Sequence, residues 1–183
     1  MQIKTISLLL VLLGLVACNS GNTRKSQHAK AAEYNGTGTL VLEPVKFANN
    51  ASVRSTVRND CHLTEKLEKF IDQYAADHYA QILTNTDIKS VPADTRILKV
   101  EIDNVRGGGG GAWSGGKSVA IKGTLSENGN IIGDFRGRRV SGGGMFAEFK
   151  GTCSIMGRCV KALGRDVAEW LQSPSKGAVL GDY

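Results

Sequence analysis

A glycine-rich stretch at residues 106–118, with the sequence RGGGGGAWSGGKS, most constrains how this chain can fold. Strand-like runs enter and leave it, so it is either a phosphate-binding loop or the tip of a β-hairpin. Residues 111–118 fit the pattern GxxxxGK[ST], in which backbone amides and the start of a following helix bind phosphate. The segment after Ser118, VAIKGTLS, alternates as a strand instead. The helix that a nucleotide site needs is missing, so we expect a hairpin with no nucleotide and no cofactor.

The runs on both sides of this stretch have the period of two that is typical of strands. The apolar positions are Leu98, Val100 and Ile102 before it, and Val119, Ile121 and Leu125 after it. Asn128 and Gly129, the strongest short hairpin signal, then lead into residues 131–140. We expect Ile131 and Phe135 on one face of that last strand, and the charged residues on the other. Together the three strands predict an antiparallel meander.

Two segments have apolar residues at the spacing of one helical face. Residues 63–84 predict a helix of about five turns with His78 on its apolar stripe, where a hydrogen-bonded histidine at the core margin is the favoured interpretation over a ligand or catalytic base. Residues 154–172 predict a second helix. Gly157 and Gly164 inside it each cost about 1 kcal/mol relative to Ala, so we infer that another backbone approaches closely there.

The remaining parts of the domain are less regular. Residues 39–47 predict a strand that Pro44 confines to an edge or ends early, and residues 52–58 predict a further short strand. The whole pattern indicates an α+β fold, a mainly antiparallel sheet of about four to five strands with two helices packed on one face. We expect a single domain at residues 38–172 and a disordered tail at residues 173–183.

The first residues predict export and lipid anchoring. The apolar run at residues 6–16 is shorter than the roughly 20 residues that span a membrane, and it reads as a signal peptide, residues 1–17. It ends in Leu-Val-Ala-Cys18, which resembles the bacterial lipobox. The resemblance implies that Cys18 carries diacylglycerol and a palmitate-type acyl chain, which together anchor the protein to the bilayer. Asn19 favours the periplasmic face of the outer membrane of a Gram-negative cell, and residues 18–37 are expected to be a flexible tether.

Three more cysteines would lie in an oxidising compartment. Cys153 and Cys159 are separated by a helical rise of about 9 Å and lie on different faces, beyond disulfide reach. Cys61 and Cys153 each precede a predicted helix and meet if both helices run the same way. We expect a Cys61–Cys153 disulfide, with Cys159 as the alternative partner of Cys61. A zinc site that adds His62, or a cysteine nucleophile, is the alternative in a different functional class, although the spacing matches no compact zinc motif.

The segments SGGGMFAEFKGTCSIMGRCVKALGRDVAEWL and GGGGGAWSGGKS resemble small periplasmic α/β lipoprotein domains. These occur in activators of penicillin-binding proteins and in the curli secretion lipoprotein, and the likeness is closer still to uncharacterised bacterial lipoprotein families of this kind. The resemblance implies fold and location, and supplies no catalytic residues. We therefore expect a non-enzymatic binding or accessory module.

The expected partner is another envelope protein or an anionic cell-wall or lipid polymer, because the chain has a formal net charge of +6. Nucleic acid is not expected in the envelope. The candidate contacts are Trp113, which either packs back on the sheet or meets a partner, Lys117, and an anion-binding stripe of Arg136, Arg138 and Arg139 beside Lys122.

Overall fold

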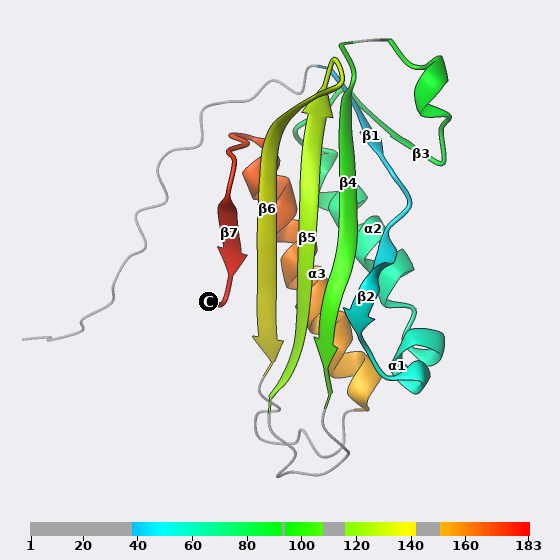
Figure 1. The fold of residues 1–183 in the computed structure, drawn as a ribbon, viewed down its shortest axis with the longest axis vertical. Coiled ribbons are helices and arrows are strands. Elements are labelled where there is room, and N and C mark those ends of the chain that lie inside the picture. Colours follow the sequence, from blue (N-terminus) through cyan, green and yellow to red (C-terminus); the bar gives the residue numbers. More distant parts are fainter. Residues whose placement is uncertain (1–37, 93, 108–115, 142–150) are drawn as a thin grey trace, which may run out of the picture. The chain divides into compact units, whose positions relative to one another are not determined.

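The computed structural model describes residues 38–92, 94–107, 116–141 and 151–183, which form a mixed sheet with its helices on one face (Figure 1). The strand order is β3-β1-β4-β5-β6-β7, and β2 also pairs with β4. The strands are β1 Thr39–Leu42, β2 Lys46–Ser52, β3 Gln81–Thr84, β4 Arg96–Arg106, β5 Lys117–Glu127, β6 Asn130–Ser141 and β7 Ala178–Gly181. The helices are α1 Ser55–Asp60, α2 Leu63–Ala75, α3 Thr152–Leu171 and the short 3-10 helix η1 Ile88–Ser90.

The predicted meander forms the centre of this sheet. β4, β5 and β6 are antiparallel, and Asn128 and Gly129 connect the last two strands with positive φ angles of 54° and 75°. The expectation of a mainly antiparallel sheet of four or five strands is wrong at both sides of the meander. β1 and β2 pair parallel to β4, β3 pairs parallel to β1, and β7 pairs parallel to β6, which gives seven strands within the described ranges. Strands of four residues, such as β3 and β7, are too short to show a period of two.

β1 and β2 run along the same edge of β4, and the chain between them contains Pro44. Leu42 pairs with Leu98, and Lys46 resumes the pairing opposite Glu101. Proline has no amide hydrogen to donate, so it interrupts the ladder. The prediction that Pro44 ends the first strand early is confirmed.

The predicted strand at residues 52–58 is wrong beyond its first residue. α1 occupies most of it, with the Arg58 amide donating to Arg54 O at 3.0 Å and the Cys61 amide donating to Val57 O at 3.2 Å. Val57 is buried by this turn. Burial of one apolar side chain therefore overrides the β propensity of the segment.

The predicted helix at residues 63–84 ends at Ala75, and its last part is strand β3. Ile82, which fits the helical stripe, pairs with Leu40 in the sheet, and the Ala80 amide donates to Gly38 O at 3.2 Å. His78 lies after the helix and forms a 3.0 Å hydrogen bond with Gln172. Pairing with β1 thus replaces the last two predicted turns.

α2 and α3 lie side by side on one face of the sheet and run in the same direction (Figure 1). A Cβ on Gly164 would lie 3.0 Å from the carbonyl carbon of Phe70 and 3.1 Å from the amide nitrogen of Ile71, which confirms the close approach predicted there. The same prediction is wrong for Gly157, which faces open space. The residues of the predicted α3 stripe are all buried: Met156, Val160, Leu163, Val167 and Leu171.

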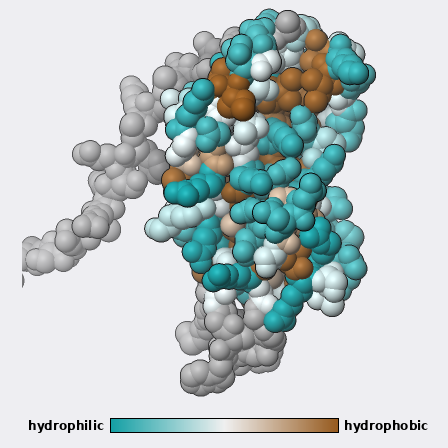
Figure 2. Space-filling model, in the orientation of Figure 1, coloured by the Kyte–Doolittle hydropathy of each residue, from teal (hydrophilic) through white to brown (hydrophobic). Residues whose placement is uncertain are grey.

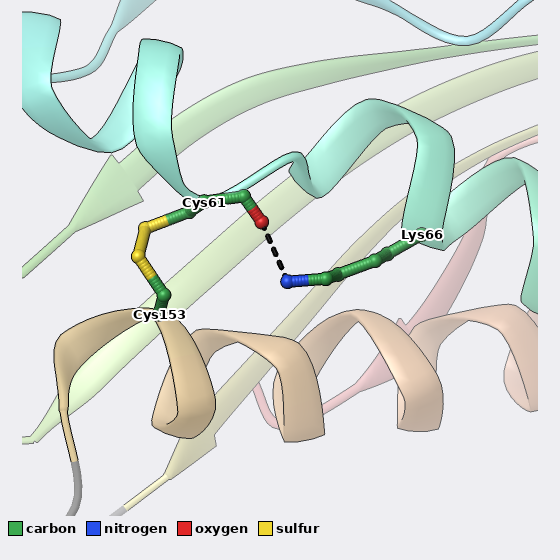
Figure 3. The surroundings of a disulfide bond; sticks show 3 residues. All are labelled: Cys61, Lys66 and Cys153. Atoms are coloured by element: carbon green, nitrogen blue, oxygen red, sulfur yellow. Dashed lines mark hydrogen bonds between the residues drawn. A yellow bond between two sulfur atoms is a disulfide. The ribbon is translucent and has the colours of Figure 1, made fainter.

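A disulfide joins the beginnings of the two helices. Cys61 and Cys153 are bonded across a sequence separation of 92 residues, the first of the two pairings expected from the sequence (Figure 3). The Lys66 ammonium group donates to Cys61 O at 2.7 Å from the first turns of α2. This end of the helical layer is therefore fixed covalently.

The last residues are ordered, which corrects the prediction of a disordered tail. β7 pairs with residues of β6 from Phe135 to Arg138, with Ala178 and Leu180 packed against the core. Two alternating apolar residues are enough for this because the rest of the sheet already provides a surface for them to cover.

Candidate functional site

The face of the sheet opposite the helices is the candidate site. Leu98, Val100 and Ile102 of β4 point into the core, so Lys99 and Glu101 between them point to the other face. No helix among the described residues covers this open face (Figure 1). Figure 2 shows it as a hydrophilic belt across the middle with apolar surface toward the upper end.

A row of charged residues crosses the belt from strand to strand. The register places Lys46 beside Glu101, Glu101 opposite Lys122, and Lys122 opposite Arg136. The carboxylate of Glu101 lies 3.5 Å from the ammonium nitrogen of Lys99 and 3.4 Å from that of Lys122. The Glu101 carboxylate thus forms ion pairs with two lysines. Lys122 and Arg136, which carry the same charge, lie directly opposite each other.

The positive charge continues along β6. Arg138 lies opposite Ala120, and among the described residues neither Arg136 nor Arg138 forms an ion pair with a carboxylate. The Arg136 guanidinium lies 5.6 Å from the centre of the Tyr183 ring. We call Lys46, Lys99, Lys122, Arg136 and Arg138 the cationic belt.

Beside the cationic belt, the face is hollowed and then becomes apolar. An open groove of about 390 Å³ is lined by Lys99, Glu101, Lys122, Thr124, Ile131 and Asp134, together with Gly123 and Phe135. The next row across the sheet pairs Leu83 with Val41, Val41 with Ile97, Ile97 with Ser126, and Ser126 with Ile131. We call Leu83, Ile97 and Ile131, which are partly or well exposed, the apolar row; Val41 between Leu83 and Ile97 is only 1% exposed. A register shift after Leu125 places Ile131, 51% exposed, on this face, so the prediction that it shares a face with Phe135 is wrong.

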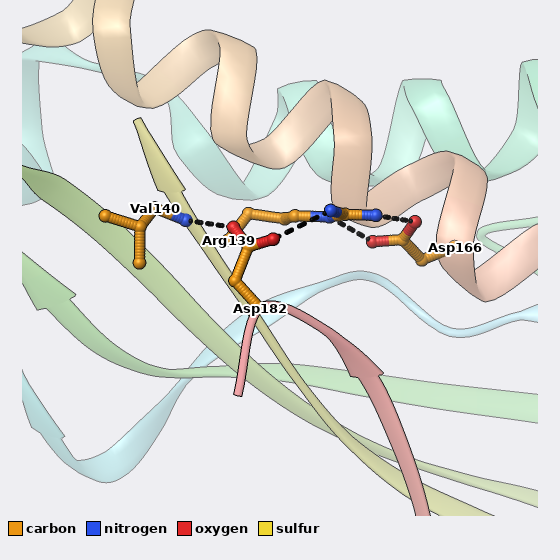
Figure 4. Close-up of polar contacts among 4 residues, drawn as sticks. All are labelled: Arg139, Val140, Asp166 and Asp182. Atoms are coloured by element: carbon orange, nitrogen blue, oxygen red, sulfur yellow. Dashed lines mark hydrogen bonds and ion pairs between the residues drawn. The ribbon is translucent and has the colours of Figure 1, made fainter. Parts of the chain in front are cut away.

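Arg139 was expected in the anion-binding stripe, and the structure corrects this. It lies opposite Val119, on the helix side of β6, because neighbouring residues of a strand point to opposite faces. Its Nε and Nη2 donate to both carboxylate oxygens of Asp166 in α3 at 2.7 and 2.6 Å, and its Nη1 donates to Asp182 at 3.0 Å (Figure 4). The hydrogen bonds to Asp166 raise the pKa of Arg139 above its usual range. Arg139 therefore links β6 to α3 and to Asp182, and its side chain does not lie on the open face.

The other residues predicted to contact a partner differ in whether the structure places them on the open face. Lys117 is only 5% exposed and does not contribute surface to the open face, so a partner contact there stays a prediction. Trp113 lies outside the described residues, as does Cys18. β5 begins at Lys117 and supplies a strand where a phosphate-binding loop needs a helix. Among the predicted contacts, Lys122, Arg136 and Arg138 are those that the structure places on the open face.

The three cysteines in the described part of the chain do not form a reactive site. Cys61 and Cys153 are consumed by the disulfide, and Cys159 is buried, with its thiol donating to Lys117 O at 3.8 Å. Burial raises the pKa of the Cys159 thiol, which disfavours the thiolate that a nucleophile or zinc ligand needs. No group of three or more His, Cys, Asp or Glu side chains among the described residues is placed to hold a metal ion. The described cysteines therefore do not favour the alternative of a thiol-dependent enzyme or a metal-binding protein.

Sequence reasoning missed the contributions of Lys46 and Tyr183 to the open face. Lys46 follows a proline that interrupts its strand, and Tyr183 belongs to the segment predicted to be disordered. Alternation in β4 and β5 does identify Lys99 and Lys122, but only the strand register shows that Lys122 meets Arg136.

No family model matches the sequence, and no curated protein matches it. Solved structures that are similar include the PelC dodecamer from Paraburkholderia phytofirmans, at 17% identity and a TM-score of 0.47, covering 70% of this chain and 87% of that one. A protein from Xanthomonas campestris assigned to family DUF330 has 11% identity and a TM-score of 0.47, covering 74% and 84%. A minor lipoprotein from Acinetobacter baumannii has 15% identity and a TM-score of 0.45, covering 74% and 92%. Similarities at this level decide neither the fold nor the function of this chain.

Within the described residues, no helix has the length and apolar character needed to cross a membrane.

Proposed function

We propose that this protein is a lipid-anchored, non-enzymatic envelope protein whose open sheet face binds an acidic region of another envelope protein. Anchoring through Cys18, at the periplasmic face of the outer membrane, is supported by the lipobox-like sequence and by Asn19. Binding is supported by the cationic belt. The two parts of the proposal have separate tests.

The single observation that carries the binding proposal is the direct opposition of Lys122 and Arg136 on the open face. Like charges in this position destabilise a sheet by up to about 1 kcal/mol, and Glu101, whose carboxylate lies 3.4 Å from Lys122, is already shared with Lys99. A carboxylate placed between Lys122 and Arg136 would turn repulsion into two attractive contacts. The face is therefore complementary to a negatively charged partner.

The arrangement favours a protein surface as the partner. The groove lies between the apolar row and the cationic belt. Ile131 of the row and Lys99 and Lys122 of the belt are among the residues that line it. Protein interfaces commonly combine an apolar region with a charged and polar rim. The open face of a second copy would not fit this face, because its own cationic belt would bring more positive charge.

The test of binding is site-specific photocrosslinking in cells. A photoreactive residue at Thr124, in the groove, is expected to give a defined protein adduct that disappears when Arg136 and Arg138 are both changed to Glu. The double reversal Lys161→Glu/Arg165→Glu on α3 is the matched control, because these two exposed residues change the charge by the same amount on the helical side. An adduct that survives the double reversal, or adducts only with lipid or polymer, would refute a protein partner on this face.

The test of anchoring uses metabolic labelling with a palmitate analogue. We expect label in the full chain and none in Cys18→Ser, which should also move from the membrane fraction to the soluble fraction. Equal labelling of both proteins would refute lipidation at Cys18. Trp113→Ala remains the probe for the glycine-rich loop, and an unchanged adduct pattern would remove this residue from the binding surface.

A further inference from the structure

The edge of β6 that does not pair with β5 is covered by the last segment of the chain, residues 173–183, which we call the tail. The Asp134 amide donates to Ser175 O at 3.2 Å, and β7 then pairs in parallel with β6. Beyond β7, the Asp182 amide donates to Arg138 O at 2.7 Å and the Asp182 carboxylate accepts from the Val140 amide at 2.8 Å. From Asp134 to Val140, the tail thus provides the hydrogen-bond partners of the edge.

The edge is matched to the sequence of the tail. Gly181 has a φ of 83°, and any Cβ there would collide with Arg138 O. Asp182 reaches Nη1 of Arg139, whose orientation is fixed by its two hydrogen bonds to Asp166 (Figure 4). A segment that fills this edge therefore needs backbone for parallel pairing, glycine at one position and a carboxylate at the next.

The tail is nevertheless held with little burial. None of the four residues of β7 is buried, Val179 is 48% exposed and Tyr183 is 64% exposed. Segments with few buried apolar contacts open at low free energy, well below global unfolding. Opening would leave the β6 edge unpaired, and unpaired edges pair readily with another chain.

We propose that the β6 edge is a strand-acceptor site that also takes the tail of a second copy, so that two molecules exchange residues 173–183. A second copy is the occupant that the geometry selects, because its tail carries the same glycine and carboxylate at the required positions. The contacts that each molecule loses on opening are regained from its partner. This exchange uses the edge of the sheet, and its test needs no partner on the open face.

The experiment mixes two full-length variants that each carry one introduced cysteine, in a Cys159→Ala background that keeps the Cys61–Cys153 disulfide. Arg136 and Val179 are register partners between β6 and β7, and both side chains are exposed. Arg136→Cys with one affinity tag is incubated with Val179→Cys carrying another and then mildly oxidised. We expect the mixed covalent dimer in excess over its statistical proportion to the two homodimers, with the bond between positions 136 and 179 identified by mass spectrometry.

Three further variants keep the result interpretable. The double variant Arg136→Cys/Val179→Cys, oxidised without mixing, should close within one chain, because β7 then lies on its own β6. Asp182→Asn should speed formation of the mixed dimer several-fold by loosening the tail, whereas Asp77→Asn, an exposed change of the same charge, should not. A mixed dimer at only the statistical proportion, while the double variant closes normally, would overturn the proposal. Failure of the double variant to close would overturn the acceptor site itself.

Discussion

Replacing Cys61 and Cys153 with alanine is expected to lower the free energy of unfolding by about 4.6 kcal/mol. The disulfide closes a loop with a sequence separation of 92 residues. In the chain-entropy model a cross-link of that length removes about 15.6 cal/mol/K from the unfolded chain, which gives about 4.6 kcal/mol at 25 °C. Single domains are stable by roughly 5–15 kcal/mol in total, so the loss is a large fraction of the stability of this one.

Equilibrium unfolding in guanidinium chloride, followed by tryptophan fluorescence, measures this loss. The wild type under reducing conditions should match the double variant, because both lack the same cross-link. Cys159→Ala serves as the control: it removes a buried sulfur without opening the loop, and should cost only about 1 kcal/mol. A loss below about 1 kcal/mol for the double variant, with an unchanged denaturant slope, would refute loop closure as the source of the stabilisation.

Further expectations concern the helical layer and the tail. Gly164→Val should lower stability by about 3 kcal/mol, because the new side chain would collide with the α2 backbone; Gly157→Ala, in open space, should raise it by up to about 1 kcal/mol, and thermal unfolding compares the two. Asp166→Asn should cost about 2 kcal/mol in chemical denaturation, because it removes a charge-assisted bidentate contact from a mostly buried site. The hydrogen bond from the Val140 amide lowers the pKa of Asp182, so its stabilisation is complete above the unfolded pKa of about 3.9 and is lost as pH falls through the lower folded pKa. Hydrogen exchange at Val140 should show this loss in the wild type and not in Asp182→Asn.

The parts of the fold that the sequence predicts are those with long periodic segments. β4, β5, β6 and α3 each have 11 or more residues, enough for the period to show which face is buried. β3 and β7, with four residues each, contain too few alternations, and β3 also continues the helical spacing of α2 by coincidence. Their pairing is determined by contacts with distant strands that no local pattern records.

The candidate site, like the fold, is only partly predictable from the sequence. Alternation identifies the residues that share a face with Arg136, but Arg139 is adjacent in sequence and points to the opposite face. Its partner Asp166 lies next to the exposed Arg165 in α3, and nothing in the helical pattern marks it as 7% exposed. The pairing exists because α3 crosses β6 at that point, which is a property of the packed layers.

The two restraints that hold the helical layer leave the open face free to act as a rigid surface. The Cys61–Cys153 disulfide fixes one end of α2 and α3, and the contact between Arg139 and Asp166 fixes α3 to β6, both on the side away from the cationic belt. Substitutions such as Arg138→Gln remove no ion pair among the described residues and no core contact, so they should change binding while leaving the unfolding free energy within about 0.5 kcal/mol of wild type. Asp166→Asn should do the reverse, because its effects pass through the fold. A binding loss for Arg138→Gln that scaled with a loss of stability would mean that the open face belongs to the structural framework and is not a recognition surface.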